Sequence, residues 1–154
     1  MPYVRIRKMK RTDLNAVGDI AARCYPKEYY EDTESFVSKF KSFPKGCFVL
    51  EARGKLVAYA ITFPYHLGQP FPLSTKLGKI QDPSCHYFHD VSVVPGNRKL
   101  GYATMLIATA WDSCTLPKSL TAVKQTEEFW CRFGFRQVKK VSYGGSMCTY
   151  MESL

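Results

Sequence analysis

Residues 91–106 place a basic, glycine-containing loop between an apolar segment and a helical pattern. Arg98, Lys99 and Gly101 lie in this loop, and Pro95 marks the turn before it. A loop that opens a helix presents several free backbone N–H groups, with the positive end of the helix dipole behind them. Such a loop can bind a phosphate or pyrophosphate group without a special side chain. These residues therefore predict an anion-binding site.

The segment just before this loop carries a candidate base. Imidazole has an ordinary pKa of about 6.5, so a histidine can accept a proton near neutral pH. Alternation along a strand would place Tyr87, His89, Val91 and Val93 on one face, and His86, Phe88, Asp90 and Ser92 on the other. The strand therefore carries two histidines on opposite faces, and for His89 a hydrogen-bonded structural histidine is the alternative interpretation.

The periodicity of apolar residues predicts the elements that position these groups. Strands are expected at 3–9, 47–52, 56–63, 86–94, 119–123, 137–141 and 147–151, and helices near 14–24, 33–43, 100–115 and 125–133. Their order along the chain is β α α β β β α β α β β. Residues 64–85 show little periodicity, and a loop of that length inside a compact domain is usually functional.

Length and composition limit the class of protein. The 154 residues suffice for one domain with one core, and 45% hydrophobic residues exclude a disordered chain. No apolar run approaches the roughly 20 residues that cross a bilayer, and the first residues lack the apolar core of a signal peptide. The six cysteines are scattered without a Cys-x-x-Cys pair, so no metal site is expected. We therefore expect a soluble cytoplasmic protein with reduced thiols.

The net charge of +9 allows two interpretations. One is a surface that binds nucleic acid, and the other is attraction of a small polyanion. The basic residues are spread along the chain and form no arginine-rich helix or zinc-finger spacing. Their positive charge argues mildly against a polycationic substrate, because like charges oppose its approach.

The anion-binding loop resembles motif A of the GNAT acyltransferase superfamily, whose signature is Arg/Gln-x-x-Gly-x-Gly/Ala. Arg98, Gly101 and Ala103 occupy the three fixed positions, and Val93, Val94 and Pro95 stand where the family has its central strand and turn. The predicted element order matches the GNAT fold along nearly the whole chain. The resemblance implies a single domain over residues 1–154, with a mixed, mostly antiparallel sheet of about seven strands, four flanking helices and a splayed central strand.

A second segment looks like motif B of the same superfamily. Phe129 and Trp130 match its aromatic pair, and Gly134-Phe135 follow after three residues, as in the motif. Many members have a tyrosine at the second aromatic position, where its phenol can protonate the departing coenzyme A thiolate. An indole N–H cannot serve as an acid near neutral pH. The acid of the family is therefore absent at Trp130.

The resemblance implies acetyl-CoA as the acyl donor and coenzyme A as the product. Backbone groups of the splayed strand would bond the pantetheine amides as a neighbouring strand would. The residues assigned to acetyl-CoA are Val91, Ser92, Val93, Arg98, Lys99, Leu100, Gly101, Tyr102, Ala103, Thr104 and Trp130.

The resemblance also bears on the base. The residues from His89 to Val93 resemble the corresponding strand of the serotonin N-acetyltransferases, whose histidines help relay a proton to water. An amine must be neutral when it attacks, so a proton acceptor is required. His89 is assigned this catalytic role. Independently of the resemblance, Tyr65, His66 and Tyr87 are candidates for contact with the acceptor.

These features predict an N-acetyltransferase that transfers an acetyl group from acetyl-CoA directly to a primary amine of a small molecule. No covalent enzyme intermediate is expected. An alternative is a protein acetyltransferase that acts on a lysine or an N-terminal amine, so the acceptor is either a small molecule or a peptide. The non-enzymatic alternatives are a basic nucleic-acid-binding domain and an acyl-CoA-sensing domain. We expect no membrane and no nucleic-acid partner.

Overall fold

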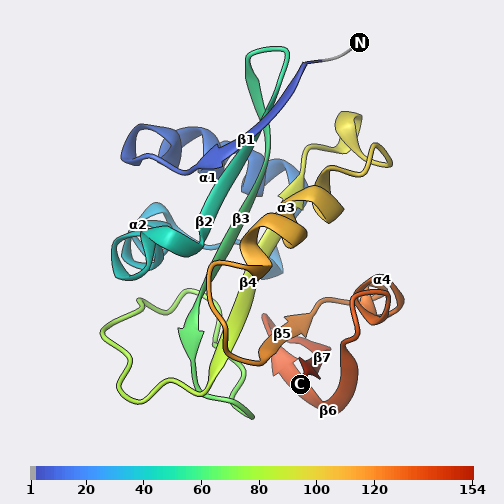
Figure 1. Ribbon diagram of the computed structural model, residues 1–154. Helices are drawn as coiled ribbons and strands as arrows, with labels where there is room; N and C mark the ends of the chain where they lie inside the picture. Colours follow the sequence, from blue (N-terminus) through green and yellow to red (C-terminus); the bar gives the residue numbers. More distant parts are fainter. Residues whose placement is uncertain (1–2) are drawn as a thin grey trace.

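The computed structural model describes residues 3–154, and their strands form one seven-stranded sheet (Figure 1). The strand order is β1-β2-β3-β4-β5-β7-β6, and only β4 and β5 are parallel neighbours. The predicted mixed, mostly antiparallel sheet is confirmed. The strands are β1 (Val4–Lys8), β2 (Cys47–Ala52), β3 (Lys55–Tyr65), β4 (Cys85–Val93), β5 (Lys118–Ala122), β6 (Arg136–Tyr143) and β7 (Ser146–Ser153).

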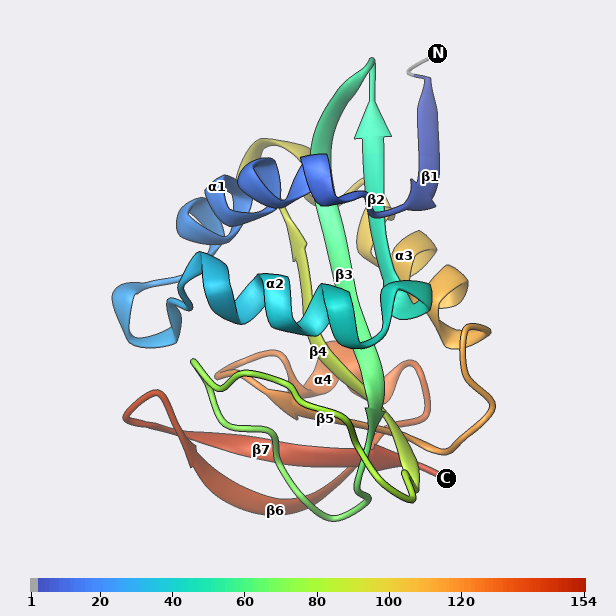
Figure 2. The same cartoon turned by 90° about the vertical axis from the view of Figure 1, so that its left-hand side faces the viewer.

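Four α-helices cover the two faces of this sheet. They are α1 (Leu14–Cys24), α2 (Thr33–Ser42), α3 (Tyr102–Trp111) and α4 (Glu127–Cys131). Figure 2 shows α1 and α2 in front of the sheet, with α3 and α4 behind it. In the same view β6 and β7 run across the lower part, whereas β2 and β3 run from top to bottom. None of the helices within residues 3–154 has the length and apolar character needed to span a membrane.

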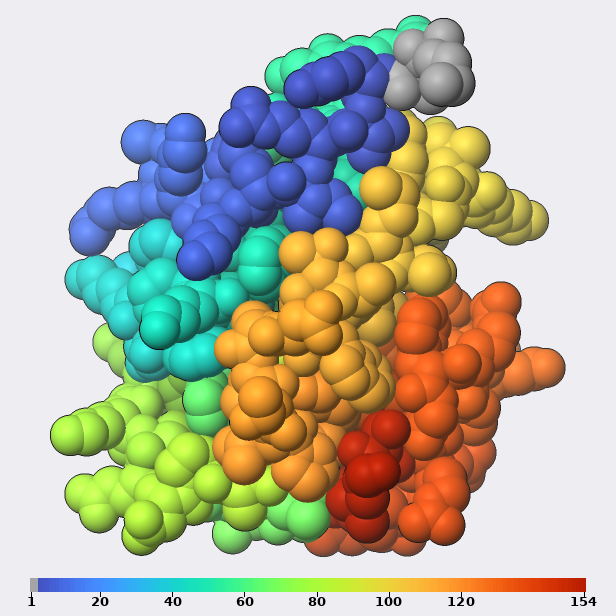
Figure 3. Space-filling model, in the orientation of Figure 1, coloured from blue at the N-terminus to red at the C-terminus, as the bar shows by residue number. Residues whose placement is uncertain are grey.

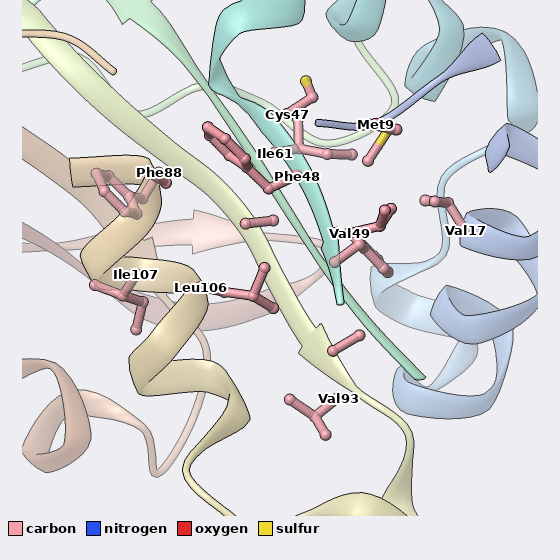
Figure 4. Close-up of a cluster of buried hydrophobic side chains, with 14 of the residues drawn as sticks. Met9, Val17, Cys47, Phe48, Val49, Ile61, Phe88, Val93, Leu106 and Ile107 are labelled. Carbon is pink, nitrogen blue, oxygen red and sulfur yellow. The ribbon is translucent and has the colours of Figure 1, made fainter. Parts of the chain in front are cut away.

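The core lies on both sides of β2 and β3. Figure 4 shows Val17 of α1 beside Val49 of β2, and Leu106 and Ile107 of α3 on the other side of the strands. All four side chains are completely buried. Burying one such side chain contributes about 1.5–3 kcal/mol. This two-sided packing holds α3 against the sheet, and therefore also holds the loop at its N-terminus.

α3 and α4 are several residues shorter than predicted, and residues with a positive φ angle mark the start of α3 and lie on both sides of α4. Gly101 has a φ of 83°, so α3 begins after it rather than at residue 100. Gln125 has a φ of 67° and Gly134 a φ of 87°, and α4 is confined to the five residues from Glu127 to Cys131 between them. A right-handed helix requires a negative φ, which the apolar periodicity does not report.

β4 contains one more residue than the stretch of β3 that it pairs with. Ile61 of β3 pairs with Asp90, and the next residue, Thr62, pairs with Phe88. His89 therefore has no direct partner on β3 and forms a β-bulge. A bulge interrupts the alternation of side chains along the strand.

The bulge changes which side chains lie together. His89 contacts Glu31, and Asp90 contacts Tyr25, so both point toward residues 25–32, which join α1 to α2. Ser92 also contacts Tyr25. The predicted alternation, which placed Asp90 and Ser92 on the face opposite His89, is therefore wrong. The extra residue shifts Asp90 and Ser92 onto the face of His89.

Candidate functional site

β4 and β5 are hydrogen-bonded neighbours over only three residue pairs. The last pair joins Phe88 of β4 to Leu120 of β5. Beyond it the two strands diverge, and the second half of β4 has no partner on this side. The predicted splayed central strand is therefore present. A cavity of about 1100 Å³ opens between the separated strands.

Most of the predicted site residues line this cavity. They are His89, Val91, Ser92, Val93, Arg98, Lys99, Gly101, Tyr102, Ala103, Thr104 and Trp130. Four do not: Leu100, Tyr65, His66 and Tyr87. Leu100 points to solvent beside the loop. Tyr65 lies at the far end of β3, His66 follows it, and the Tyr87 side chain is buried beneath the cavity wall. Their positions do not support the prediction that these last three contact the acceptor.

The loop before α3 has the free donors of an anion site. Within residues 3–154, the backbone N–H groups of residues 99–104 have no hydrogen-bond acceptor. The first helical hydrogen bond runs from the N–H of Met105 to the carbonyl of Gly101. A Cβ atom on Gly101 would meet no atom within 4 Å, so open space faces this residue. Several aligned donors at the positive end of a helix suit a pyrophosphate group.

Basic side chains gather at the same end of the cavity. Figure 3 shows a notch at the right-hand edge, between the loop that precedes α3, in yellow, and the residues around α4, in orange-red. The basic residues that line the cavity come from these two segments: Arg98, Lys99, Lys124 and Arg132. Their charge adds to the field of the helix N-terminus, and both favour a polyanion.

A different chemistry lines the part of the cavity formed by the α1–α2 connection and the end of β6. Here the lining carries carboxylates and phenols: Tyr25, Glu28, Tyr29, Glu31 and Tyr143. Leu73 is the one cavity-lining residue from the long loop between β3 and β4 in the described chain. Glu31 is already paired with other side chains, so the aromatic rings and the exposed carboxylate of Glu28 are what suit this side of the cavity to a ligand with an apolar body and a positive charge.

The α1–α2 connection and the β6–β7 turn meet and close the cavity on this side. The Ser146 hydroxyl donates to Glu28 Oε2 at 2.9 Å, and the rings of Tyr29 and Tyr143 lie 6.1 Å apart. A Cβ atom on Gly144 would lie 2.3 Å from the carbonyl oxygen of Glu28, so only glycine allows this contact. In Figure 2 the two segments lie one above the other at the left-hand edge.

His89 belongs to a buried chain of charged groups. Its Nε2 lies 2.7 Å from Glu31 Oε2, and Glu31 Oε1 lies 3.3 Å from the Nζ atom of Lys39. The Lys39 side chain is completely buried, and that of Glu31 is 3% exposed. Burial alone would raise the pKa of Glu31, but the charge and hydrogen bond of His89, with the charge of Lys39, lower it to about 2.

This chain determines which nitrogen of His89 can react. An ionised carboxylate only accepts hydrogen bonds, so Nε2 must carry the proton that Glu31 accepts. The other nitrogen, Nδ1, is then the one with a free lone pair when the ring is neutral. Nδ1 is buried and has no hydrogen-bond partner in the described chain. When the ring is neutral, Glu31 therefore holds it in this one tautomer.

Asp90, next to His89 on β4, is a structural carboxylate whose oxygen atoms are all used in hydrogen bonds within the protein. Its carboxylate accepts hydrogen bonds from Tyr25 at 2.6 Å, Tyr59 at 2.6 Å and Ser92 at 2.8 Å. Burial raises the pKa of this carboxyl. Three hydroxyl donors occupy its oxygen atoms, so Asp90 ties the α1–α2 connection to the splayed strand. His86, two pairs before the splay, bonds Thr62, and burial lowers its pKa to about 3.

Several cavity residues were not predicted from the sequence. Glu31 precedes the cap of a predicted helix, and no motif marks it as a partner of His89. Thr121 lies on a predicted strand and Tyr143 lies just beyond one, and neither was assigned a role from the sequence. The only sequence signal was the concentration of aromatic and acidic residues in 25–32, which breaks the helical pattern there.

Removing the Lys39 charge should destabilise the protein strongly. The Lys39→Met variant keeps the length of the side chain but leaves the buried carboxylate of Glu31 without its ammonium partner. Breaking a buried ion pair on one side costs about 3–5 kcal/mol. Lys76→Met is the matched control, because the Lys76–Glu34 pair is exposed on both sides and contributes at most about 1 kcal/mol. Urea denaturation of both variants measures the difference, and equal stabilities would contradict this account of Lys39.

Comparison with known proteins gives a family and a set of similar folds. The model of the acetyltransferase (GNAT) family matches residues 14–135. No protein of curated function matches the sequence significantly. Solved structures are similar over almost the whole chain.

Three of these similar structures come from proteins with different names and source organisms. The loading GNATL domain of CurA from Lyngbya majuscula has a TM-score of 0.81 and 13% identity, covering 97% of this chain and 96% of that one. Arabidopsis thaliana Naa50, in complex with the bisubstrate analogue CoA-Ac-MVNAL, has a TM-score of 0.76 and 13% identity, covering 98% of each chain. Diaminobutyrate acetyltransferase EctA from Paenibacillus lautus has a TM-score of 0.76 and 12% identity, covering 99% of this chain and 96% of that one. At these identities the likeness is one of fold.

Proposed function

The chain belongs to the GNAT acetyltransferase family, and we propose that it transfers the acetyl group of acetyl-CoA directly to a primary amine of a small molecule. The observation that carries the proposal is the two-part cavity. One part has free amides and basic side chains suited to a polyanion, and the other has carboxylates and phenols suited to a cationic amine. His89 and the unpaired half of β4 lie between these parts.

The residues present fit coenzyme A. The amides of residues 99–104 and the open space at Gly101 would hold the pyrophosphate. The unpaired edge of β4 at Val91, Ser92 and Val93 would bond the pantetheine amides in the manner of a neighbouring strand. Acetyl-CoA supplies an acyl group activated as a thioester, and the cavity leaves room for it between β4 and β5.

The base would act on the incoming amine. An alkylammonium group has a pKa of about 10, so it must lose a proton before its nitrogen can attack the thioester. In the proposed reaction His89 accepts this proton on Nδ1, directly or through one water molecule. The carboxylate of Glu31 stabilises the imidazolium that forms, because it is ionised and hydrogen-bonded to Nε2.

The contact between the α1–α2 connection and the β6–β7 turn supports a small acceptor. A polypeptide that crosses the active site needs an open groove on the acceptor side, and here Glu28 and Ser146 meet across it. The fold alone does not decide this point, because similar structures include one bound to a peptide-type bisubstrate analogue and one bound to diaminobutyric acid and coenzyme A.

Trp130 is expected to pack rather than to donate a proton. Its ring contacts the rings of Phe88 and Phe135, and its indole nitrogen makes no hydrogen bond within residues 3–154. Trp130→Phe should therefore keep most of the turnover, measured as kcat with saturating acetyl-CoA and amine. Loss of a general acid lowers the rate by about 100-fold or more. A loss of that size in the Phe variant would contradict a packing role.

The proposed function is tested by acetyl-CoA turnover against a panel of small primary amines and, in parallel, peptides with free N-termini or lysines. We expect turnover with small amines and little with peptides. The reverse result would support protein acetylation instead.

Thermal stabilisation by coenzyme A, compared with that by an oligonucleotide, separates an acyl-CoA site from a nucleic-acid surface, because a ligand that binds only the folded state raises its stability. Stabilisation by coenzyme A without any turnover would indicate a sensor.

A further inference from the structure

Thr121 lies at the point where β4 and β5 separate. The last residue pair between the strands is Phe88 with Leu120, so the next residues, His89 and Thr121, face each other across the opening. Both lie on the same face, because Tyr87 contacts both: its ring centroid is 6.4 Å from that of His89, and its hydroxyl is 2.7 Å from Thr121 Oγ1. Thr121 lines the cavity and is half-buried.

The hydrogen bonds around Tyr87 assign the direction in which the Thr121 hydroxyl donates. The Tyr87 oxygen accepts a hydrogen bond from the backbone N–H of Phe71 at 3.1 Å. Its own proton needs an acceptor, because the phenol is buried and burial raises its pKa to about 12. Thr121 Oγ1 is the one acceptor within reach in residues 3–154. Tyr87 therefore donates to Thr121.

The proton of the Thr121 hydroxyl is then free. A hydroxyl carries one donor, and Thr121 makes no other side-chain hydrogen bond in the described part of the chain. The chain of donors runs from Phe71 N–H to the Tyr87 hydroxyl, to the Thr121 hydroxyl, and then into the cavity. A donor that is oriented before the ligand arrives has no reorganisation to undergo during the reaction.

We propose that the Thr121 hydroxyl donates a hydrogen bond to the thioester sulfur and stabilises the coenzyme A thiolate as it leaves. The proposal rests on the function proposed above, and it makes Thr121 a catalytic residue and Tyr87 a positioning residue. The proposal also explains how the thiolate could leave although Trp130 replaces the tyrosine that serves as the acid in many family members: the Thr121 hydroxyl would supply the hydrogen bond.

The step balances without a general acid. The amine nitrogen forms a bond to the carbonyl carbon, the carbon–sulfur bond breaks, and its electron pair goes to sulfur. The amine proton goes to His89 or to water. A thiol has a pKa of about 8.5, so a thiolate can leave near neutral pH when one hydrogen bond stabilises it. It takes up a proton from solvent as coenzyme A departs.

Thr121→Val tests the proposal, because valine has the same shape and lacks the hydroxyl. We expect kcat to fall by about 100-fold, the effect of losing one such donor, with little change in coenzyme A affinity. The pKa of the bound coenzyme A thiol, followed by thiolate absorbance in a pH titration, should rise in this variant. Thr121→Ser keeps the hydroxyl and should restore both values toward those of the wild type.

Two further variants separate this role from a structural one. Thr109→Val removes an exposed hydroxyl on α3 that bonds the Met105 carbonyl, so it should leave kcat and the thiol pKa unchanged. Tyr87→Phe should lower kcat in the wild-type background but have no further effect on kcat in the Thr121→Val background, because both act through one hydroxyl.

The two proposals fail in different ways. If the wild type acetylates no amine, the proposed function is wrong, while the thiol titration still tests Thr121. If the wild type is active, and Thr121→Val keeps both its kcat and the wild-type thiol pKa, the assignment of Thr121 is overturned.

Discussion

Replacing Gly101 with valine is expected to abolish coenzyme A binding in a protein that still folds. A Cβ atom at this position projects into open space beside the free amides of residues 99–104, where the pyrophosphate would lie. A branched side chain there would keep the phosphate oxygens from the amides. We expect the affinity for coenzyme A, measured by calorimetric titration, to fall by at least about 100-fold, since several charge-assisted hydrogen bonds are lost together.

The Gly101 variant needs a control for backbone strain. Gly101 has a φ of 83°, a conformation that valine adopts only with strain of about 1–3 kcal/mol. Gly54 has a φ of 76°, is equally open and lies in the β2–β3 turn away from the cavity. Gly54→Val should lose a similar amount of stability and keep its coenzyme A affinity. If Gly101→Val binds coenzyme A as the wild type does, the loop does not hold the pyrophosphate.

His89→Gln is expected to lower kcat by about 100-fold or more, on the scale of a lost general base. Glutamine can still bond Glu31 but cannot take up a proton. Coenzyme A binding should be nearly unchanged, because the anion loop lies elsewhere in the cavity. Steady-state rates and a coenzyme A titration on the same preparation separate these two effects.

The pH–rate profile identifies the group that titrates. If His89 is the base, the rate of the wild type should fall at acid pH, because an imidazolium cannot accept the amine proton. Glu31 has a pKa lowered to about 2, so it stays ionised across this range and cannot produce the acidic limb. The limb should disappear in His89→Gln, which leaves a low rate that is flat toward acid pH.

His86→Gln is the control for a purely structural histidine on the same strand. His86 is completely buried, bonds Thr62 and lies outside the cavity. Its variant should lose stability and keep the pH–rate profile of the wild type. If His89→Gln behaves in the same way, with a lower melting temperature and full turnover of the folded fraction, then His89 is structural and the base lies elsewhere.

Features that depend only on residues adjacent along the chain could be predicted from the sequence. The apolar segment before the loop, the glycine at its end and the helical periodicity after it are all local. Backbone geometry therefore places free amides at the N-terminus of α3 whatever packs around it. The mixed sheet was predictable for a related reason, since each strand and helix has its own apolar period. Gly101 and the basic residues Arg98 and Lys99 could therefore be assigned to the anion site without information about distant parts of the chain.

The surroundings of His89 are determined by contacts between residues that lie far apart along the chain. Glu31 and His89 are 58 positions apart, and Tyr87 and Thr121 are 34 apart. The bulge at His89 exists only in the pairing of β3 with β4, and one extra residue there reverses the face of every residue after it on the strand. Apolar periodicity averages over many positions, so it cannot locate a shift of a single residue. Packing of the whole sheet determines that shift, and with it the side chains that share the cavity with His89.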